Sequence, residues 1–341
     1  MTEDAVRPIA LTMGEPAGIG GEITLKAWTA RGGGVPPFFA IDDAARLSDL
    51  AKALGMTVPV VAIDAAEEAV RHFESALPVL PQPLHVKPTP GRPDPANVPA
   101  VIGAVDRAVE LARAGRAAGL VTNPIHKATL YEAGFEHPGH TEYLGALAGA
   151  VPQMMLAVPG LRVVPVTVHL PLAAVAGSLT QAAIVGAGQR AARALVTDFG
   201  IARPRLAVAA LNPHGGEAGA LGEEERTMIV PAIEALRAEG IDAAGPTPAD
   251  TLFHEAARAR YDAALCMYHD QALIPLKTID FDHGVNVTLG LPFVRTSPDH
   301  GTALAIAGTG EASPASLIAA LRLAAEMAAQ RRAGGGQRDV A

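Results

Sequence analysis

Short apolar runs alternate along the chain with longer amphipathic stretches, and this alternation is the first guide to its structure. Apolar runs between turn residues predict buried strands, and apolar residues at helical spacing predict helices. The predicted strands cover 7–12, 38–41, 58–63, 119–123, 153–158, 162–168, 205–211 and 261–268. The predicted helices cover 22–30, 43–55, 65–76, 98–112, 180–199, 222–238, 250–259 and 314–332, and another opens at His140. Strands that alternate with helices predict a layered α/β fold.

Breaks in this pattern predict the connections. Seven prolines between residues 81 and 99 predict a surface loop. The pair Pro159-Gly160 predicts a turn that joins its flanking strands as an antiparallel hairpin. The tail from Ala333 contains three consecutive glycines and is predicted to be disordered. The last helices are expected to return to the first half of the chain, as in a two-domain protein with a cleft between its domains.

Composition narrows the class of protein. Of the 341 residues, 49% are hydrophobic but only 4% are aromatic, so the core must consist mainly of Ala, Val, Leu and Ile, as is usual for helix-covered parallel sheets. The net charge of −8 and the absence of a dense Lys/Arg run argue against nucleic-acid binding. The one cysteine, Cys266, lies in an apolar run and is predicted to be a core residue.

We recognise no targeting signal or membrane segment in the sequence. Its first residues lack the apolar segment of a signal peptide, and no apolar run is long enough to cross a membrane. One cysteine permits no intrachain disulfide, which fits a reducing compartment. We therefore expect a soluble, cytoplasmic protein without a membrane partner.

Three of the eleven histidines follow predicted strands directly or within a few residues. His169 follows 162–168, His214 follows 205–211 and His269 follows 261–268. Parallel strands bring their carboxyl ends to one edge of a sheet, and three imidazoles at one edge suit a divalent metal such as zinc. A single histidine in such a place is more often structural, but three together favour a metal site. Asp270 could orient the neighbouring imidazole or hold charge near the metal.

Two other groups of residues suggest anion binding. Lys277, Asn286 and Arg295 combine two cations with an amide, which suits a phosphate or a carboxylate, although each alone is more often a surface residue. The glycine-rich stretch 13–22 lies between a strand and a helix, where backbone N–H groups can meet an anion. Its spacing matches neither the Rossmann nor the P-loop pattern, so a ligand role and a simple tight turn remain equal alternatives. Asp250 is interpreted as a helix N-cap.

Eight stretches in order connect the chain to a known family. The sequence resembles the 4-hydroxythreonine-4-phosphate dehydrogenases of pyridoxal phosphate biosynthesis. Gly21 departs from the proline found in many relatives, which affects the turn and not the chemistry. The matching stretches are Gly14-Glu-Pro-Ala-Gly-Ile-Gly20, Thr122-Asn-Pro-Ile-His-Lys127, Gly139-His-Thr-Glu-Tyr143, Thr167-Val-His-Leu-Pro171, Leu211-Asn-Pro-His-Gly-Gly-Glu217, Gly245-Pro-Thr-Pro-Ala-Asp250, Tyr268-His-Asp-Gln271 and Gly284-Val-Asn-Val-Thr288.

The resemblance implies a fold like that of isocitrate and isopropylmalate dehydrogenases, with two α/β domains, a cleft between them and a non-Rossmann nucleotide site. We expect a nucleotide-side domain from 1–136 plus 296–341, and a metal, substrate and dimer-interface domain from 137–295. The family builds its metal site at a homodimer interface, with ligands from both subunits. By resemblance the metal ligands are His169, His214 and His269, the substrate-binding residues are His140, Thr141, Lys277, Asn286 and Arg295, and the cofactor-binding residues are Gly14, Gly18 and Gly20.

The implied reaction is oxidation of the C3 hydroxyl of 4-phosphooxy-L-threonine by NAD or NADP, followed by loss of carbon dioxide. The metal would be zinc, magnesium or cobalt, and Asp270 or Lys277 would accept the hydroxyl proton. A related dehydrogenase acting on threonate or erythronate 4-phosphate, or on a dihydrodiol carboxylate, is an alternative. A metal-dependent hydrolase and a non-catalytic binding protein remain less favoured.

Overall fold

Strands covered by helices form both parts of the chain, whose structure is a computed structural model that describes residues 7–336. The first unit contains the chain up to Pro152 together with Leu291–Ala329. The second contains Gln153–Gly290 and the chain from Gln330 onward. The predicted return of the last helices to the first half is therefore confirmed. The functional division at residues 136 and 295 stays a prediction, because compactness alone places the boundaries elsewhere.

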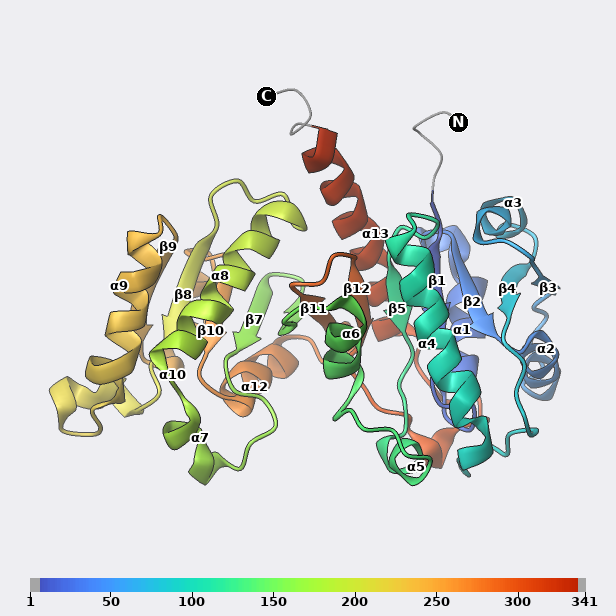
Figure 1. Ribbon diagram of the computed structural model, residues 1–341, viewed down its shortest axis with the longest axis horizontal. Helices are drawn as coiled ribbons and strands as arrows, with labels where there is room; N and C mark the ends of the chain where they lie inside the picture. The colour runs from blue at the N-terminus through green and yellow to red at the C-terminus, as the bar shows by residue number, and fades with distance from the viewer. Residues whose placement is uncertain (1–6, 337–341) are drawn as a thin grey trace. The chain divides into compact units, whose positions relative to one another are not determined.

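The first unit holds six strands in its described part, all parallel, in the order β3-β4-β2-β1-β5-β12. The strands are β1 (Ile9–Thr12), β2 (Phe38–Asp42), β3 (Val60–Ala62), β4 (Leu77–Pro81), β5 (Leu120–Thr122) and β12 (Arg295–Pro298). The helices are α1 (Gly20–Thr29), α2 (Ala44–Ala53), α3 (Ala69–His72), α4 (Val98–Arg113), α5 (Lys127–Glu132), α6 (His140–Ala148) and most of α13 (Ala315–Gly336). Helix α4 lies in front of β1 in Figure 1.

The second unit has a mixed sheet in the order β11-β6-β7-β10-β8-β9. Strand β6 is antiparallel to both its neighbours, whereas β7, β10, β8 and β9 run parallel. The strands are β6 (Gln153–Val158), β7 (Leu161–Pro165), β8 (Arg205–Ala209), β9 (Asp242–Thr247), β10 (Ala263–Cys266) and β11 (Val285–Leu289). The helices are α7 (Leu172–Ser178), α8 (Gln181–Thr197), α9 (Val230–Ala238), α10 (Ala249–Leu252), α11 (Glu255–Arg258) and α12 (His269–Ile279). The predicted hairpin of β6 and β7 is confirmed.

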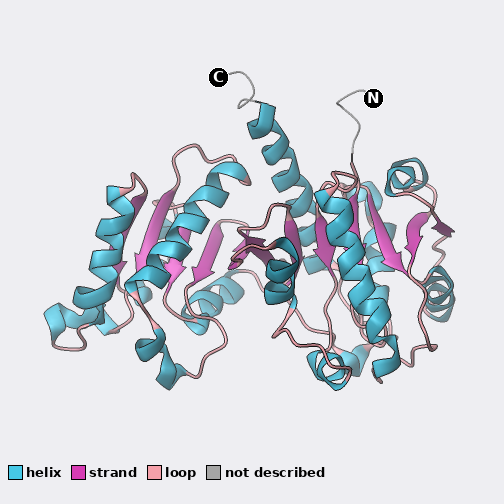
Figure 2. Ribbon diagram, viewed as in Figure 1, coloured by secondary structure: helices cyan, strands magenta, loops and turns pink. Residues whose placement is uncertain are grey.

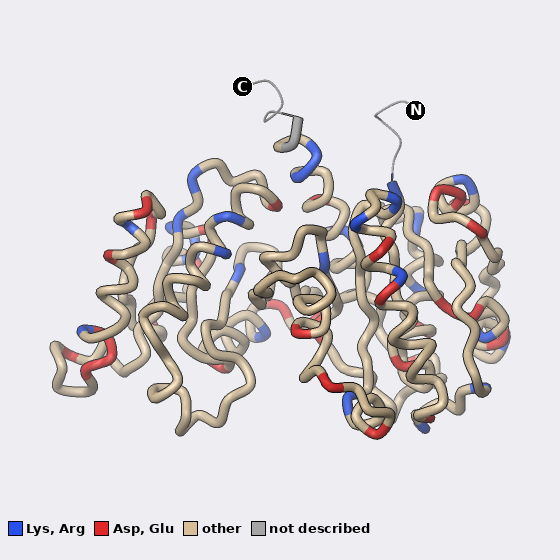
Figure 3. Tube along the Cα trace, viewed as in Figure 1, with Lys and Arg blue, Asp and Glu red and all other residues tan. Residues whose placement is uncertain are grey.

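The cores have the composition that the low aromatic content predicts. Buried side chains are mostly Ala, Val, Leu and Ile, and Cys266 is fully buried as expected. On α4 the predicted apolar face is confirmed, since Val98, Val101, Val105 and Val109 are all buried in the first unit's core. In each unit helices lie on both faces of the strands (Figure 2). Positive and negative residues are mixed along both units (Figure 3), in keeping with the absence of a basic run.

Several predicted elements differ from the structure. The helix expected over 65–76 is a short 3-10 turn followed by α3, and the one expected over 250–259 breaks into α10 and α11. The helix expected over 222–238 begins with a π-helical turn, Glu225–Ile229, ahead of α9. Helix α13 continues to Gly336, so the residues from Ala333 to that point are helical and not disordered; residues 337–341 of the predicted tail lie outside the described part.

Within residues 7–336, no single helix has the length and hydropathy of a membrane span. The bent pair α7 and α8 meets the length and composition criteria only when the two helices are taken together.

Candidate active site

The three predicted metal ligands follow three neighbouring parallel strands of the second unit. Strand β10 pairs with β7 on one side and with β8 on the other. His169 lies after β7, His269 after β10 and His214 after β8. The ring centroids of His169 and His269 are 6.0 Å apart. Two imidazoles on one ion place their centroids roughly 5–6 Å apart when each metal–nitrogen bond is about 2.0–2.1 Å, so this pair suits a shared ion.

His269 is held in one orientation by its neighbour. It opens α12, and its Nδ1 lies 2.7 Å from Oδ1 of Asp270. With Nδ1 engaged by a carboxylate, Nε2 is the nitrogen available to a metal, which is the usual arrangement of metal-binding histidines. The position of Asp270 therefore suits orientation of the imidazole.

His214 lies in a turn with unusual backbone geometry. Five consecutive residues, His214 to Ala218, have positive φ angles between 44° and 76°. Runs of left-handed residues are costly for side chains other than glycine, so this turn must be held by other contacts. The buried Glu225 holds the segment just before the turn: its Oε1 accepts hydrogen bonds from the N–H groups of Leu211 and Asn212 at 2.8 and 2.7 Å. Strained backbone of this kind occurs mostly at functional sites, and here it includes His214, a predicted metal ligand.

The described part of one chain does not bring three metal ligands together. Among residues 7–336, no three His, Cys, Asp or Glu side chains are grouped closely enough to hold a metal ion. The imidazoles of His169 and His269 fit a metal as a pair, and His214 belongs to the adjacent strand. Convergence of all three on one ion, with a second subunit contributing, remains a prediction.

A buried cation occupies the first unit beside the predicted substrate histidine. Arg295 begins β12, is 2% exposed and donates from Nη2 to the hydroxyl of Thr122 at 2.6 Å. Burial lowers the pKa of Arg295 to about 10, while Glu142 acts in the opposite direction. The Nε2 atom of His140 is also buried and has no hydrogen-bond partner among the described residues. Burial and then the charges of Arg295 and Lys127 hold the pKa of His140 well below its usual range.

The five predicted substrate residues are divided between the units. His140 and Thr141 open α6 in the first unit, as predicted, and Arg295 belongs to the same unit. Lys277 and Asn286 belong to the second. The Nζ of Lys277 lies 5.4 Å from the ring centroid of Phe281. The side-chain Oδ1 of Asn286 is buried without a partner in the described part of the chain.

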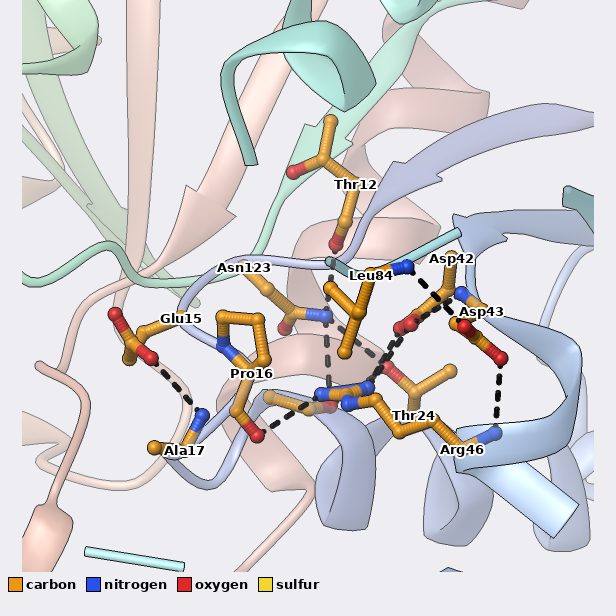
Figure 4. Close-up of polar contacts among 11 residues, drawn as sticks. Thr12, Glu15, Pro16, Ala17, Thr24, Asp42, Asp43, Arg46, Leu84 and Asn123 are labelled. Atoms are coloured by element: carbon orange, nitrogen blue, oxygen red, sulfur yellow. Dashed lines mark hydrogen bonds and ion pairs between the residues drawn. The ribbon is translucent and has the colours of Figure 1, made fainter. Parts of the chain in front are cut away.

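The glycine-rich turn packs tightly against its own unit (Figure 4). A side chain at Gly14, where φ is +66°, would lie 2.6 Å from the carbonyl of Pro124, and one at Gly20 would lie 2.8 Å from the carbonyl of Met13. A side chain at Gly18 would lie 2.9 Å from the carbonyl of Thr302. These close approaches explain the glycines without a ligand.

Backbone N–H groups of the same turn are already engaged. Glu15 Oε1 accepts from the N–H of Ala17 at 3.0 Å, and the N–H of Gly18 bonds to the carbonyl of Glu15. Asn123 ties the turn to α1 through Nδ2, which donates to the carbonyl of Thr12 and to Thr24 Oγ1. The alternative of a structural turn thus has a full physical explanation, and nucleotide contacts of Gly14, Gly18 and Gly20 stay a prediction.

One site interpretation is wrong. Asp250 is not an N-cap, because α10 begins at Ala249 with Pro248 as its cap residue.

Thr122, Glu225 and Gln271 are buried polar residues with hydrogen bonds at the predicted site, and the sequence pattern did not single them out. A polar residue inside an apolar stretch, such as Thr122 in Leu120–Thr122, was the available indication.

Comparison with known proteins identifies the family. A family model described as pyridoxal phosphate biosynthetic protein PdxA matches residues 35–324. The chain is 54% identical over 345 aligned positions to the 4-hydroxythreonine-4-phosphate dehydrogenase of Bradyrhizobium diazoefficiens, covering 97% of this chain and 100% of that one. The crystal structure of the Klebsiella pneumoniae 4-hydroxythreonine-4-phosphate dehydrogenase matches with a TM-score of 0.86 at 36% identity, covering 94% of this chain and 99% of that one.

A second kind of enzyme is more distantly similar. The terephthalate 1,2-cis-dihydrodiol dehydrogenase of Burkholderia xenovorans matches with a TM-score of 0.64 at 28% identity, covering 94% of this chain and 98% of that one. The family model and the near-complete coverage of the first two proteins decide the assignment. The chain belongs to the PdxA family of pyridoxal phosphate biosynthetic proteins, the 4-hydroxythreonine-4-phosphate dehydrogenases.

Proposed function

We propose that the protein is an NAD- or NADP-linked dehydrogenase of pyridoxal 5′-phosphate biosynthesis. Its substrate would be 4-phosphooxy-L-threonine, oxidised at the C3 hydroxyl to 2-amino-3-oxo-4-phosphooxybutanoate, which then loses carbon dioxide to give 3-amino-2-oxopropyl phosphate. The observation that carries this proposal is 54% identity to a 4-hydroxythreonine-4-phosphate dehydrogenase along nearly the whole chain.

The residues that would hold a divalent ion are His169, His214 and His269. An ion held there would supply Lewis acidity to the hydroxyl that is oxidised and to the carbonyl formed from it. Imidazole nitrogen favours zinc or cobalt over magnesium, which prefers oxygen ligands. The 6.0 Å separation of the His169 and His269 rings supports this assignment.

Arg295 is the residue we assign to the substrate phosphate. Its guanidinium is buried, and Thr122 fixes one of its nitrogens, so its charge is oriented before substrate arrives. Charge-assisted hydrogen bonds are worth about 1.5–3 kcal/mol. A fixed, desolvated guanidinium also distinguishes a phosphorylated substrate from an uncharged analogue. The Nε2 of His140 and the Oδ1 of Asn286 have no hydrogen-bond partner among residues 7–336, and each would be available to a substrate hydroxyl or amino group.

Of the two candidate bases, Asp270 is already engaged with the His269 imidazole. We therefore assign Asp270 to orienting His269. Lys277 is then the candidate that accepts the hydroxyl proton, because lysine is among the side chains that act as general bases.

A homodimer is part of the proposal. Large apolar side chains are exposed in the segments that follow two of the metal-site histidines: Leu170 and Leu172 come directly after His169, while Ile274 lies within α12, which His269 opens, and Phe281 lies just after α12. Leu172 and Phe281 are 72% and 73% exposed. Exposed apolar groups of this size favour an interface with another chain. A second subunit would complete a metal site for which the described residues of one chain do not group three ligands.

The nicotinamide cofactor and the cellular location are the least supported parts of the proposal. Membership in a dehydrogenase family supports NAD or NADP, and the first unit is the proposed nucleotide side. A cytoplasmic location is proposed from the sequence alone.

The test is a substrate panel with the purified protein. The panel contains 4-phosphooxy-L-threonine, the 4-phosphates of threonate and erythronate, and a dihydrodiol carboxylate, each with NAD and with NADP. Growth of the reduced-nicotinamide absorbance and release of carbon dioxide are both measured. We expect both signals with 4-phosphooxy-L-threonine. Turnover of a sugar-acid phosphate alone would replace the proposed substrate, and hydrolysis without nicotinamide reduction would replace the reaction class.

Two histidine variants link the reaction to the metal site. We expect His269→Ala to abolish metal-dependent NAD reduction while the protein remains folded. His283→Ala is the matched control, because His283 also pairs its Nδ1 with a nearby carboxylate, Asp280, in the same unit. Full turnover by His269→Ala would remove this residue from the proposed metal site.

A further inference from the structure

Gln271 is a buried amide that connects two strand ends of the second unit. It is the third residue of α12 and is 7% exposed. Its Oε1 accepts a hydrogen bond from the N–H of Met267 at 2.7 Å. Its Nε2 donates to the carbonyl of Ala210 at 2.6 Å. Both bonds are buried, so neither is weakened by competition with water.

These two bonds join the chain segments that carry two predicted metal ligands. Met267 directly follows β10 and lies two residues before His269, while Ala210 directly follows β8 and lies four residues before His214. The backbone ladder of β8 and β10 ends before these positions, at the pairing of Leu265 with Val208. Gln271 therefore continues the connection between the two strands beyond the point where their backbones pair.

The two partners require a side chain that both donates and accepts, as an amide does. An N–H of the backbone can only donate and a carbonyl can only accept, so the bridging side chain must offer both an acceptor and a donor. A glutamine near the start of a helix can reach back to a free N–H as a cap, and the bond to Met267 resembles that role. The bond to Ala210 does not, because a cap needs no contact with another strand.

The third histidine strand is connected to the same residue. The hydroxyl of Thr167 donates to the carbonyl of Met267 at 2.7 Å, two residues before His169. Met267 is thus held through its N–H by Gln271 and through its carbonyl by Thr167. The segments before all three histidines are joined through one backbone position.

We propose that Gln271 is a positioning residue, whose carboxamide sets the spacing between the His269 and His214 segments. The inference rests on the proposed metal-dependent function, since positioning matters only if these histidines share an ion. Ligand geometry must be held closely for tight metal binding, and changes to groups that orient ligands typically cost about 10–100-fold in metal affinity.

The test compares Gln271→Met with the wild type by titration with Co²⁺ alone. Methionine has a similar length and no hydrogen-bonding amide, so both bonds are removed with little change in volume. We expect the Co²⁺ dissociation constant to rise about 10–100-fold, with an altered visible absorption spectrum of the bound ion. In metal-free protein, hydrogen exchange at the Met267 amide should become faster.

Tyr261→Phe is the matched control. It removes one buried side-chain-to-backbone hydrogen bond, from the Tyr261 hydroxyl to the carbonyl of Leu252, near the amino end of β10. Its Co²⁺ affinity should equal that of the wild type. Equal affinity in Gln271→Met as well would overturn the inference and leave the proposed metal site intact. Failure of the wild type to bind Co²⁺ would overturn the metal site and the inference together.

Gln271→Asn covers the case in which the methionine variant does not fold. It keeps the amide but is one methylene too short to span both partners, so its Co²⁺ affinity should also fall. Unfolding of both Gln271 variants, with Tyr261→Phe still folded, would show a purely structural role and would contradict the proposal.

Discussion

His140 combines a buried ring nitrogen with two nearby positive charges. Its Nε2 has no partner among the described residues, and burial followed by the charges of Arg295 and Lys127 lowers its pKa well below the usual value. The native imidazole is therefore harder to protonate than the imidazole of the unfolded chain. Below a pH of about 6.5 the unfolded chain binds more protons, so lowering the pH favours unfolding.

The stability of the protein without substrate or metal should therefore fall as the pH is lowered. Between pH 6.5 and 5.5 the wild type should lose at most about 1 kcal/mol of unfolding free energy through His140 alone, because the unfolded imidazole gains less than one proton over this range. His140→Gln removes the titrating group and should be less acid-sensitive by that amount, as measured by urea unfolding at pH 7.5, 6.5 and 5.5. The exposed His85 provides the control variant His85→Gln. Equal acid sensitivity in the wild type and His140→Gln would contradict the prediction.

At the scale of single residues, the sequence predicted the positions of the histidines better than it predicted the residues that hold their segments. Histidines at strand ends are visible because the apolar run before each of them is visible. Gln271 bonds to a backbone atom 61 positions away, and Glu225 bonds to one 14 positions away. Such partners depend on strand register and on turn geometry, which no local pattern specifies.

At the scale of an element, α8 contains two glycines with opposite surroundings. Gly188 is buried against α9, where an added Cβ would lie 2.7 and 2.9 Å from the methyl carbons of Leu236. At Gly186 the nearest atoms belong to the guanidinium of Arg190, at 3.1 and 3.4 Å. Leu236 is fully buried and cannot move away, whereas the Arg190 guanidinium is the end of a flexible side chain, which donates a hydrogen bond to Gln153 Oε1 at 3.0 Å.

The two glycines should therefore respond in opposite directions to alanine. Gly186→Ala should stabilise the protein by about 0.5–1 kcal/mol, because alanine favours a helix over glycine. Gly188→Ala should destabilise it, because overpacking costs about 1–3 kcal/mol and exceeds that gain. Urea unfolding midpoints of both variants test the pair. A stabilising Gly188→Ala would mean that α8 and α9 can separate without cost.

Elements with strong periodicity were predicted well, and short or proline-containing ones were not. Helix α4 and the β6–β7 hairpin follow from apolar spacing and a Pro-Gly turn. Strand β4 contains Pro78 and Pro81, and β9 contains Gly245 and Pro246. Proline and glycine are unfavourable inside strands, so local propensity does not predict a strand at either place. Pairing with neighbouring strands in the folded chain outweighs that local preference.

At the scale of the whole molecule, the proposed dimer links assembly to metal binding. Leu172 begins α7 close after His169 and is among the most exposed apolar residues of the described chain. Leu172→Asp places a charge on the proposed interface, so it should shift the sedimentation profile from dimer toward monomer. Co²⁺ affinity and NAD reduction should fall together with the dimer fraction. Val196→Asp, at an exposed position on α8, is the matched control.

Two outcomes would contradict the shared site. One is a wild-type monomer with full activity in sedimentation and assay. The other is a Leu172→Asp monomer that retains both Co²⁺ binding and turnover, since a single chain would then hold the ion alone.

The broad architecture of the molecule was available from the sequence, but its subdivision was not. Alternating strands and helices predicted the α/β class, and the long last helix was expected to return to the first half. The compact units divide at 152/153 and 290/291, within stretches that have no change of composition. Compactness arises from contacts between distant segments, so local composition does not reveal such boundaries.

The chain enters and leaves the main part of the second unit at almost the same place. Gln153, its first residue, faces Leu289, its next-to-last, in the antiparallel pairing of β6 and β11. A segment whose two ends are paired with each other resembles an inserted domain, which can be exchanged without separating its ends. Exchange of residues 153–290 between relatives should therefore need only two splice points. The part that carries His169, His214 and His269 could then be recombined separately from the part that carries Arg295.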